Sequence, residues 1–243
     1  MTDELDLPPV YEAVTLDAGG EDPRAHARRL AAAGGEAGLF VWRPSAARLD
    51  CAVVLRPQDA ADGLLPVALV AAVAMLDALG RAGPAAVAAD LVWPATIRIN
   101  GGAVGGIALD LGPGEAPEWM VVSAALRRAG IPDIEAGERP DLTSLAEEGF
   151  GAVSDRAILE AFARYFLVWM DRWEEGGFSA VAPHWLQRAR SAGGDTVIEY
   201  GGELVAGGIE GLDDSGALLL DAAQRPRLAL EAQLLAPDPA KNR

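Results

Sequence analysis

Residues 91–109 read Leu-Val-Trp-Pro-Ala-Thr-Ile-Arg-Ile-Asn-Gly-Gly-Ala-Val-Gly-Gly-Ile-Ala-Leu, and this stretch says most about the fold. Apolar residues recur on both sides of Asn100-Gly101, and an Asn-Gly pair between two apolar runs is the strongest short-range signal for a β-hairpin. Pro94 and Ala95 interrupt the run before it. We therefore predict three short strands here, at residues 87–93, 96–100 and 103–109.

Further strands and helices are predicted on both sides of this hairpin. Asp22-Pro23 is a good N-cap and first-turn pair for a helix, and residues 64–79 carry a broad apolar face at helical spacing. Ser154 is the expected N-cap of another helix. The predicted strands are residues 10–16, 38–42, 49–55 and 119–126, and the predicted helices are residues 24–33, 64–79, 155–174 and 185–190.

The pattern changes after residue 193 to short alternating strands, which is typical of a small β-barrel. We expect these strands at residues 196–200, 203–209, 216–221 and 227–230. The sequence thus predicts an α+β protein in which residues 1–190 form a mixed sheet flanked by helices. A small SH3-like β-barrel domain of residues 191–243 follows it.

Charge and composition exclude several classes of function. The 20 Lys and Arg residues face 36 Asp and Glu residues, and a net charge of −16 argues against nucleic acid as a partner. One cysteine, Cys51, and two histidines, His26 and His184, lack the spacing of metal ligands, so no metal site is predicted. Cys51 lies in an apolar strand and is expected to be buried.

The sequence shows no membrane-spanning segment. Residues 64–75 form the longest apolar stretch, which is shorter than the roughly 20 residues a helix needs to cross a bilayer. The first residues are acidic, unlike a signal peptide. We expect a cytoplasmic protein, and the abundance of alanine suggests a GC-rich, bacterial source.

Three stretches, in the same order, resemble the biotin and lipoate protein ligase superfamily. Residues 55–57 with the helix at 64–79 are similar to the strand, proline and alanine-rich helix before the ligase active-site strands. Residues 91–109 resemble the family block KWPNDLYLNGRKLGGILVE, and residues 193–220 resemble the small C-terminal β domain of biotin ligases. The resemblance implies a reaction in which ATP, with Mg²⁺, adenylates a small carboxylic acid that then passes to a lysine of a carrier domain.

The residues that carry this chemistry in the family are replaced here. Val92 stands at the position of the family lysine, and Lys241 is the single lysine in the sequence. Ala95-Thr96 replaces Asn-Asp, and Ala103 replaces the second basic residue of the block. Loss of one charge-stabilising group of this kind typically slows a reaction by about 10² to 10³. No catalytic residue is assigned from the sequence.

Two arginines of a shortened Gly/Arg loop are the strongest candidates for ligand binding. Arg43 and Arg48 flank the position at which the family holds its ligand carboxylate and phosphate, and two guanidinium groups can clamp an anion. Surface or hairpin roles are the alternative. Glycines let a ligand approach the backbone closely, but they also serve turns and tight strand packing. The further candidate ligand-binding residues are Trp93, Asn100, Gly101, Gly105 and Gly106.

Two functions remain open at this stage. The first is a divergent ligase that transfers an acid such as biotin, lipoate or octanoate to a carrier-domain lysine through an adenylate. The second is a catalytically inactive relative, a pseudoenzyme that binds a small acid or a biotinyl or lipoyl carrier domain. The resemblance also leaves a homodimer open. Function belongs to the site rather than the fold, so the fold alone does not decide between them.

Overall fold

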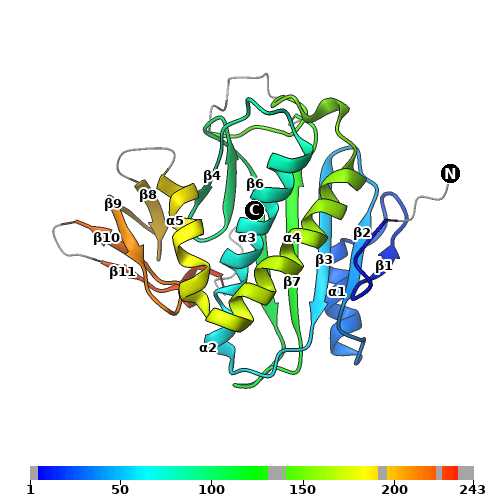
Figure 1. Cartoon of the computed structure of the whole chain (residues 1–243), viewed down its shortest axis with the longest axis horizontal. Coiled ribbons are helices and arrows are strands. Elements are labelled where there is room, and N and C mark those ends of the chain that lie inside the picture. Colours follow the sequence, from blue (N-terminus) through cyan, green and yellow to red (C-terminus); the bar gives the residue numbers. More distant parts are fainter. Residues whose placement is uncertain (1–4, 131–138, 140, 191–195, 223–225, 235–243) are drawn as a thin grey trace.

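The computed structural model describes residues 5–130, 139, 141–190, 196–222 and 226–234. These residues form a seven-stranded mixed sheet with helices on both faces and a smaller four-stranded sheet near the C-terminal end (Figure 1). The predicted α+β class with a mixed sheet flanked by helices is confirmed.

Seven of the predicted strands build the large sheet. In spatial order they are β1 (Glu12–Thr15), β2 (Leu39–Arg43), β3 (Arg48–Leu55), β7 (Met120–Arg127), β6 (Gly102–Leu111), β5 (Thr96–Ile99) and β4 (Ala89–Val92). β1 and β2 run parallel, and every other neighbouring pair is antiparallel. Asn100 and Gly101 have φ values of 49° and 89°, as a tight turn with two left-handed residues requires. The predicted hairpin is therefore confirmed.

Helices cover the two faces unequally. α3 (Val67–Ala82) and α4 (Asp155–Gly176) cross in front of the sheet in Figure 1, whereas α1 (Pro23–Ala32) lies behind β2, β3 and β7. The predicted N-caps are confirmed, since Asp22 accepts from the amide of Ala25 at 3.1 Å and Ser154 from that of Ala157 at 3.2 Å. The remaining helices are α2 (Ala61–Leu64), α5 (Ala182–Arg190) and α6 (Leu230–Leu234), with 3-10 turns at Phe150–Ala152 and Phe178–Ala180.

The end of α3 differs from the sequence prediction. The sequence predicts a helix that ends at residue 79, just before Gly80, but α3 continues to Ala82. It is capped by Gly83, whose amide donates to the carbonyl of Leu79 at 2.8 Å. A single glycine inside a helix costs only about 1 kcal/mol relative to alanine. The burial of nearly the whole α3 surface outweighs that cost, and Gly83-Pro84 supplies the stop.

The face behind the sheet is covered only in part. Ala27 and Ala31 of α1 pack on Val41, Ala52 and Val54 of β2 and β3. Because these α1 residues are alanines, the helix lies close to the sheet without shielding its more distant strands. This leaves the part of the face near β5 and β6 half-exposed.

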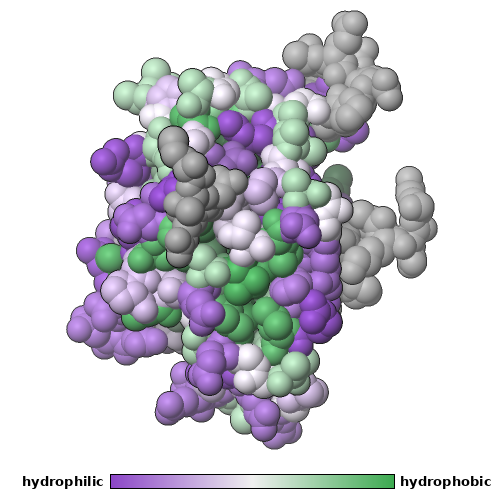
Figure 2. All heavy atoms as spheres, turned by 90° about the vertical axis from the view of Figure 1, so that its right-hand side faces the viewer, coloured by the Kyte–Doolittle hydropathy of each residue, from purple (hydrophilic) through white to green (hydrophobic). Residues whose placement is uncertain are grey.

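β1 forms one edge of the large sheet, and Figure 2 views the molecule from this side. A hydrophobic area surrounded by hydrophilic residues is visible there, and Val10, just before β1, is 56% exposed. A strand edge with unpaired backbone groups beside apolar surface can pair with a second copy. The homodimer nevertheless stays a prediction.

The C-terminal strands form the second sheet, in the order β11 (Arg227–Leu228), β10 (Leu218–Asp221), β9 (Glu203–Leu212) and β8 (Thr196–Tyr200), all antiparallel. This sheet shares one apolar core with α3, through Leu218, Leu220 and Leu228. The predicted boundary after residue 190 adjoins residues 191–195, outside the described residues. The division into two domains therefore stays a prediction. Within the described residues, no helix is both long and apolar enough to span a bilayer.

Candidate functional site

One row of paired residues crosses five strands of the large sheet. It runs from Arg43 on β2 through Asp50, Ala125 and Gly106 to Thr96 on β5. Directly paired residues on antiparallel strands point to the same face. Asp50 and Gly106 stand two strand spacings apart, about 10 Å. The pairing thus brings the candidates Arg43 and Gly106, 63 positions apart in sequence, onto one face.

This face is the one on which α1 packs, because Val41 and Ala52, two residues from Arg43 and Asp50 on the same strands, contact α1. Beyond α1 the surface is made of small residues. Gly106, Ala125 and Thr96 are each half-exposed. Together they form a floor of short side chains on this face.

The two candidate arginines meet at one carboxylate, that of Asp50. Arg43 Nη2 donates to Asp50 Oδ2 at 3.2 Å, and Arg48 Nε donates to Asp50 Oδ1 at 3.0 Å. Asp50 is only 3% exposed. Arg43 Nη1 also donates to the carbonyl of Gly20 at 2.7 Å, whereas its Nε is buried without an acceptor among the described atoms. Sequence reasoning missed Asp50, although it is the one acidic residue in the apolar run 49–55.

Sequence reasoning also missed Arg127, which stands directly opposite Arg48 in the β3–β7 pair. Like charges directly opposite on neighbouring strands destabilise a sheet. Arg127 Nη1 donates to the carbonyls of Ala103 at 3.0 Å and Thr143 at 2.6 Å, which carry no charge. Arg43, Arg48 and Arg127 with Asp50 therefore carry three positive charges and one negative, a local excess of two in a chain with a net charge of −16.

Two further acidic side chains on this face, Asp110 and Asp90, are also paired with arginines. Asp110 on β6 accepts from Arg24 of α1 at 2.6 and 3.0 Å and lies 3.4 Å from Arg28. Asp90 on β4 accepts from Arg98 at 2.7 Å. The described residues contain no group of three metal-ligating side chains. Mg²⁺ is bound through carboxylates together with substrate phosphates, and these neutralised carboxylates do not fit that role.

The candidate glycines are explained by close backbone packing. Gly105 has a φ of +151°, and a Cβ atom there would lie 2.0 Å from the carbonyl oxygen of Ala125. A Cβ atom on Gly106 would lie 2.6 Å from that of Ala95. These contacts support the strand-packing alternative, and ligand contact at both positions stays a prediction.

Asn100 and Gly101 serve the hairpin turn. Asn100 Nδ2 donates to Glu148 at 2.5 Å, and Asn100 Oδ1 accepts from the amide of Ala88 at 3.3 Å. Nothing lies within 4 Å of a Cβ atom built on Gly101. The turn therefore needs this pair for its backbone conformation, and a role in binding stays a prediction.

Trp93 lies apart from the other candidates. It is 2% exposed, and its Nε1 donates to the carbonyl of Gly216 at 3.0 Å. Its ring lies 6.3 Å from that of Tyr200 on β8. Trp93 belongs to the core that the two sheets share, so the structure gives it a role in joining them.

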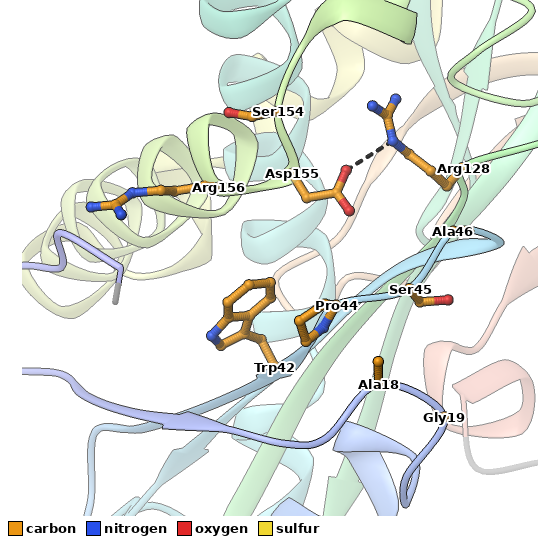
Figure 3. Close-up of a pocket in the computed structure, with 10 residues that line it drawn as sticks. All are labelled: Ala18, Gly19, Trp42, Pro44, Ser45, Ala46, Arg128, Ser154, Asp155 and Arg156. Carbon is orange, nitrogen blue, oxygen red and sulfur yellow. Dashed lines mark ion pairs between the residues drawn. The ribbon is translucent and has the colours of Figure 1, made fainter. Parts of the chain in front are cut away.

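A hollow of about 610 Å³ lies beside the β2–β3 hairpin (Figure 3). Asp155 turns its carboxylate toward Arg128, and Oδ1 lies 2.9 Å from Nε. Burial raises the pKa of Asp155, although Arg128 acts in the opposite direction. Arg128 also donates to the carbonyls of Phe150 and Val153. The lining residues are Ala18, Gly19, Trp42, Pro44, Ser45, Ala46, Arg128, Ser154, Asp155 and Arg156.

The hollow and the arginine cluster meet at one loop. Gly19 lines the hollow, and the carbonyl of the next residue, Gly20, accepts from Arg43. The β2–β3 hairpin contributes Pro44 to the hollow, and it contributes Arg43 and Arg48 to the cluster. Trp42, which lines the hollow, packs on the α3 and α4 side of the sheet, whereas Arg43 lies on the α1 side, so the hollow and the cluster open to different faces.

Known proteins match this arrangement of sheet, helices and C-terminal strands. Residues 7–187 match the model of the biotin/lipoate A/B protein ligase family, and the chain belongs to that family. It is 36% identical over 184 residues to a biotin–[acetyl-CoA-carboxylase] ligase of Paracoccus denitrificans, covering 74% of this chain and 76% of that one. The predicted resemblance is confirmed.

Solved structures agree on the fold. A biotin protein ligase-like protein of unknown function from Silicibacter sp. superposes with a TM-score of 0.83 and 29% identity, covering 96% of this chain and all of that one. The apo biotin protein ligase of Aquifex aeolicus gives a TM-score of 0.71 at 15% identity, covering 90% and 96% of the two chains. At that identity the likeness concerns the fold alone.

Proposed function

We propose that this protein binds a small carboxylic acid of the biotin, lipoate or octanoate type, free or as its acyl-adenylate, on the sheet face on which α1 packs. The observation that carries the proposal is the convergence of Arg43 and Arg48 in the row that also contains Gly106. The acyl part would lie on the floor of Gly106, Ala125 and Thr96, and its anionic group would meet the arginines.

The charge distribution supports an anionic ligand. Arginine binds carboxylates and phosphates through paired N–H groups, and its charge persists at any physiological pH. An excess of positive charge around Arg43, Arg48 and Arg127 stands out in a strongly acidic chain. Long-range repulsion of anions by the rest of the protein makes these local cations decisive for binding.

Efficient adenylation is less well supported than binding. A carboxylate that attacks a triphosphate needs preorganised positive charge to offset the approach of two anions. Val92 occupies the family lysine position, and Asp50 already neutralises part of the charge of Arg43 and Arg48. We therefore place binding first. The 36% identity to a protein named as a biotin ligase favours the second candidate, transfer of the acid to the lysine of a carrier domain.

Calorimetry of the full chain against biotin, lipoate, octanoate and stable analogues of their adenylates tests the proposal. We expect at least one to bind, and Arg48→Gln to weaken that binding about tenfold. Arg164→Gln is the matched control, because Arg164 is similarly exposed but lies on α4, where it pairs with Asp6. Failure of every compound to bind would remove the proposal.

Acid-dependent ATP–pyrophosphate exchange separates the two candidates. A binding protein gives no exchange above background with any of the three acids, whereas a ligase does. Native mass spectrometry with a biotinyl or lipoyl carrier domain tests separately whether such a domain forms a complex with this protein.

A further inference from the structure

We propose that Asp50 competes with the ligand's anionic group for Arg48, and that an anion binds by replacing Asp50 as the partner of Arg48. The ligand in this proposal, a small acid or its adenylate, rests on the proposed function. The exchange itself requires only an anion that carries oxygen acceptors.

The cluster is held asymmetrically. Arg43 is 17% exposed at its side chain and is fixed at two points, by the Gly20 carbonyl and by Asp50. The Arg48 side chain is 51% exposed, and among the described residues its guanidinium is held by Asp50 alone. Arg48 can therefore leave Asp50 and turn to an incoming anion, while Arg43 and Asp50 stay in place.

Two donors at this site lack a charged acceptor that would balance them. Arg43 Nε is buried without an acceptor in the described part of the chain, and buried polar groups of this kind are uncommon in native structures. Arg127, opposite Arg48, bonds to neutral carbonyls. An anion placed between Arg48 and Arg127 would relieve the repulsion of these two charges.

A purely structural ion pair makes the opposite prediction. If Asp50 serves to hold Arg43 and Arg48 in a binding geometry, its loss weakens anion binding. If Asp50 competes with the anion, its loss strengthens binding, because neither guanidinium group then has an internal carboxylate partner.

Calorimetry with inorganic pyrophosphate and AMP at low ionic strength measures the difference. The variant is Asp50→Asn. The control is Asp110→Asn, which removes the same charge from the same face at a site held by Arg24 and Arg28. We expect Asp50→Asn to raise the affinity for pyrophosphate about tenfold or more, and Asp110→Asn to change it less than threefold. Adding Arg48→Gln to Asp50→Asn should abolish the gain.

Equal or lower affinity of Asp50→Asn, or an equal gain in Asp110→Asn, would overturn the inference. NMR of the wild-type protein gives a reading that does not depend on the folding of Asp50→Asn. The Nε–H signal of Arg48, assigned by its loss in Arg48→Gln, should shift on addition of pyrophosphate, while that of Arg24 should not. A stationary Arg48 signal at saturating pyrophosphate would equally refute displacement.

The outcome is separable from that of the proposed function. If no small acid binds but Asp50→Asn tightens pyrophosphate binding, the competitor role stands and the acid-binding proposal fails. If an acid binds at this face and Asp50→Asn brings no gain, only the competitor role fails.

Discussion

Replacement of Trp93 by phenylalanine tests whether the two sheets form one cooperative unit. Trp93 Nε1 donates to the carbonyl of Gly216, and both residues are buried. Phenylalanine cannot donate, so the carbonyl loses its partner, which costs about 1–3 kcal/mol. The smaller ring also leaves a void, for which we add about 1 kcal/mol. We expect the free energy of unfolding to fall by about 2–4 kcal/mol, with Tm lower by roughly 8 °C for a chain of this size.

Urea unfolding followed by far-UV circular dichroism measures the loss, because tryptophan fluorescence is itself altered by the substitution. Hydrogen exchange locates it, and we expect faster exchange in residues 216–228. Trp119→Phe is the control, since Trp119 packs on the α1 side of the sheet, away from the C-terminal strands. A change in unfolding free energy below about 0.5 kcal/mol, or unchanged exchange in residues 216–228, would refute a shared core and favour two independent domains.

Three further substitutions test other parts of the structure. Gly105→Ala should lower the free energy of unfolding by more than about 2 kcal/mol in urea titration, because its Cβ would clash with Ala125; Gly101→Ala, with open space around it, should cost only about 1 kcal/mol. Burial raises the pKa of Asp155, so the protonated form is favoured in the folded state and that advantage is lost as the pH rises through the raised pKa. Wild type should therefore lose stability relative to Asp155→Asn as the pH of the urea titration rises above the ordinary pKa of an aspartate; a difference between the two that does not change with pH would contradict this. Asp213 accepts from the amides of Ser215 and Ala217 at 2.9 and 3.0 Å and from Arg227 at 2.6 Å, so Asp213→Ala should cost about 1–2 kcal/mol and speed hydrogen exchange in β10, whereas Asp214→Ala should change neither.

Local signals in the sequence predicted the elements well. Asn100-Gly101 identified the hairpin, and Asp22 and Ser154 identified two helix starts, because each of these features depends on neighbours within a few residues. The predicted end of α3 was three residues too early. Burial of the helix outweighs the weak tendency of Gly80 to end it. Cys51 was correctly expected to be buried, and burial raises the pKa of its thiol.

The composition of the site could not be read from local patterns. Asp50 meets Arg43 because β2 and β3 pair in one register, and Arg127 faces Arg48 because β7 lies beside β3. The second pairing joins residues 79 positions apart in sequence. A shift of one residue would turn every side chain to the other face, so the cluster is a property of the sheet. The same reasoning explains Trp93, whose partner Gly216 follows it by 123 residues.

The arginine cluster also bears on what membership of the ligase family means for this chain. A carboxylate that attacks a triphosphate needs positive charge that is available to both anions. This chain pairs its two candidate arginines, Arg43 and Arg48, with a buried carboxylate. An ion pair of this kind leaves the fold intact and lowers the field that an incoming anion meets. Fold similarity and 36% identity to a named ligase are therefore compatible with a weak or absent adenylation activity. Under the proposed function, the partner of Arg48, either Asp50 or the ligand, decides how strongly an anion binds at this face.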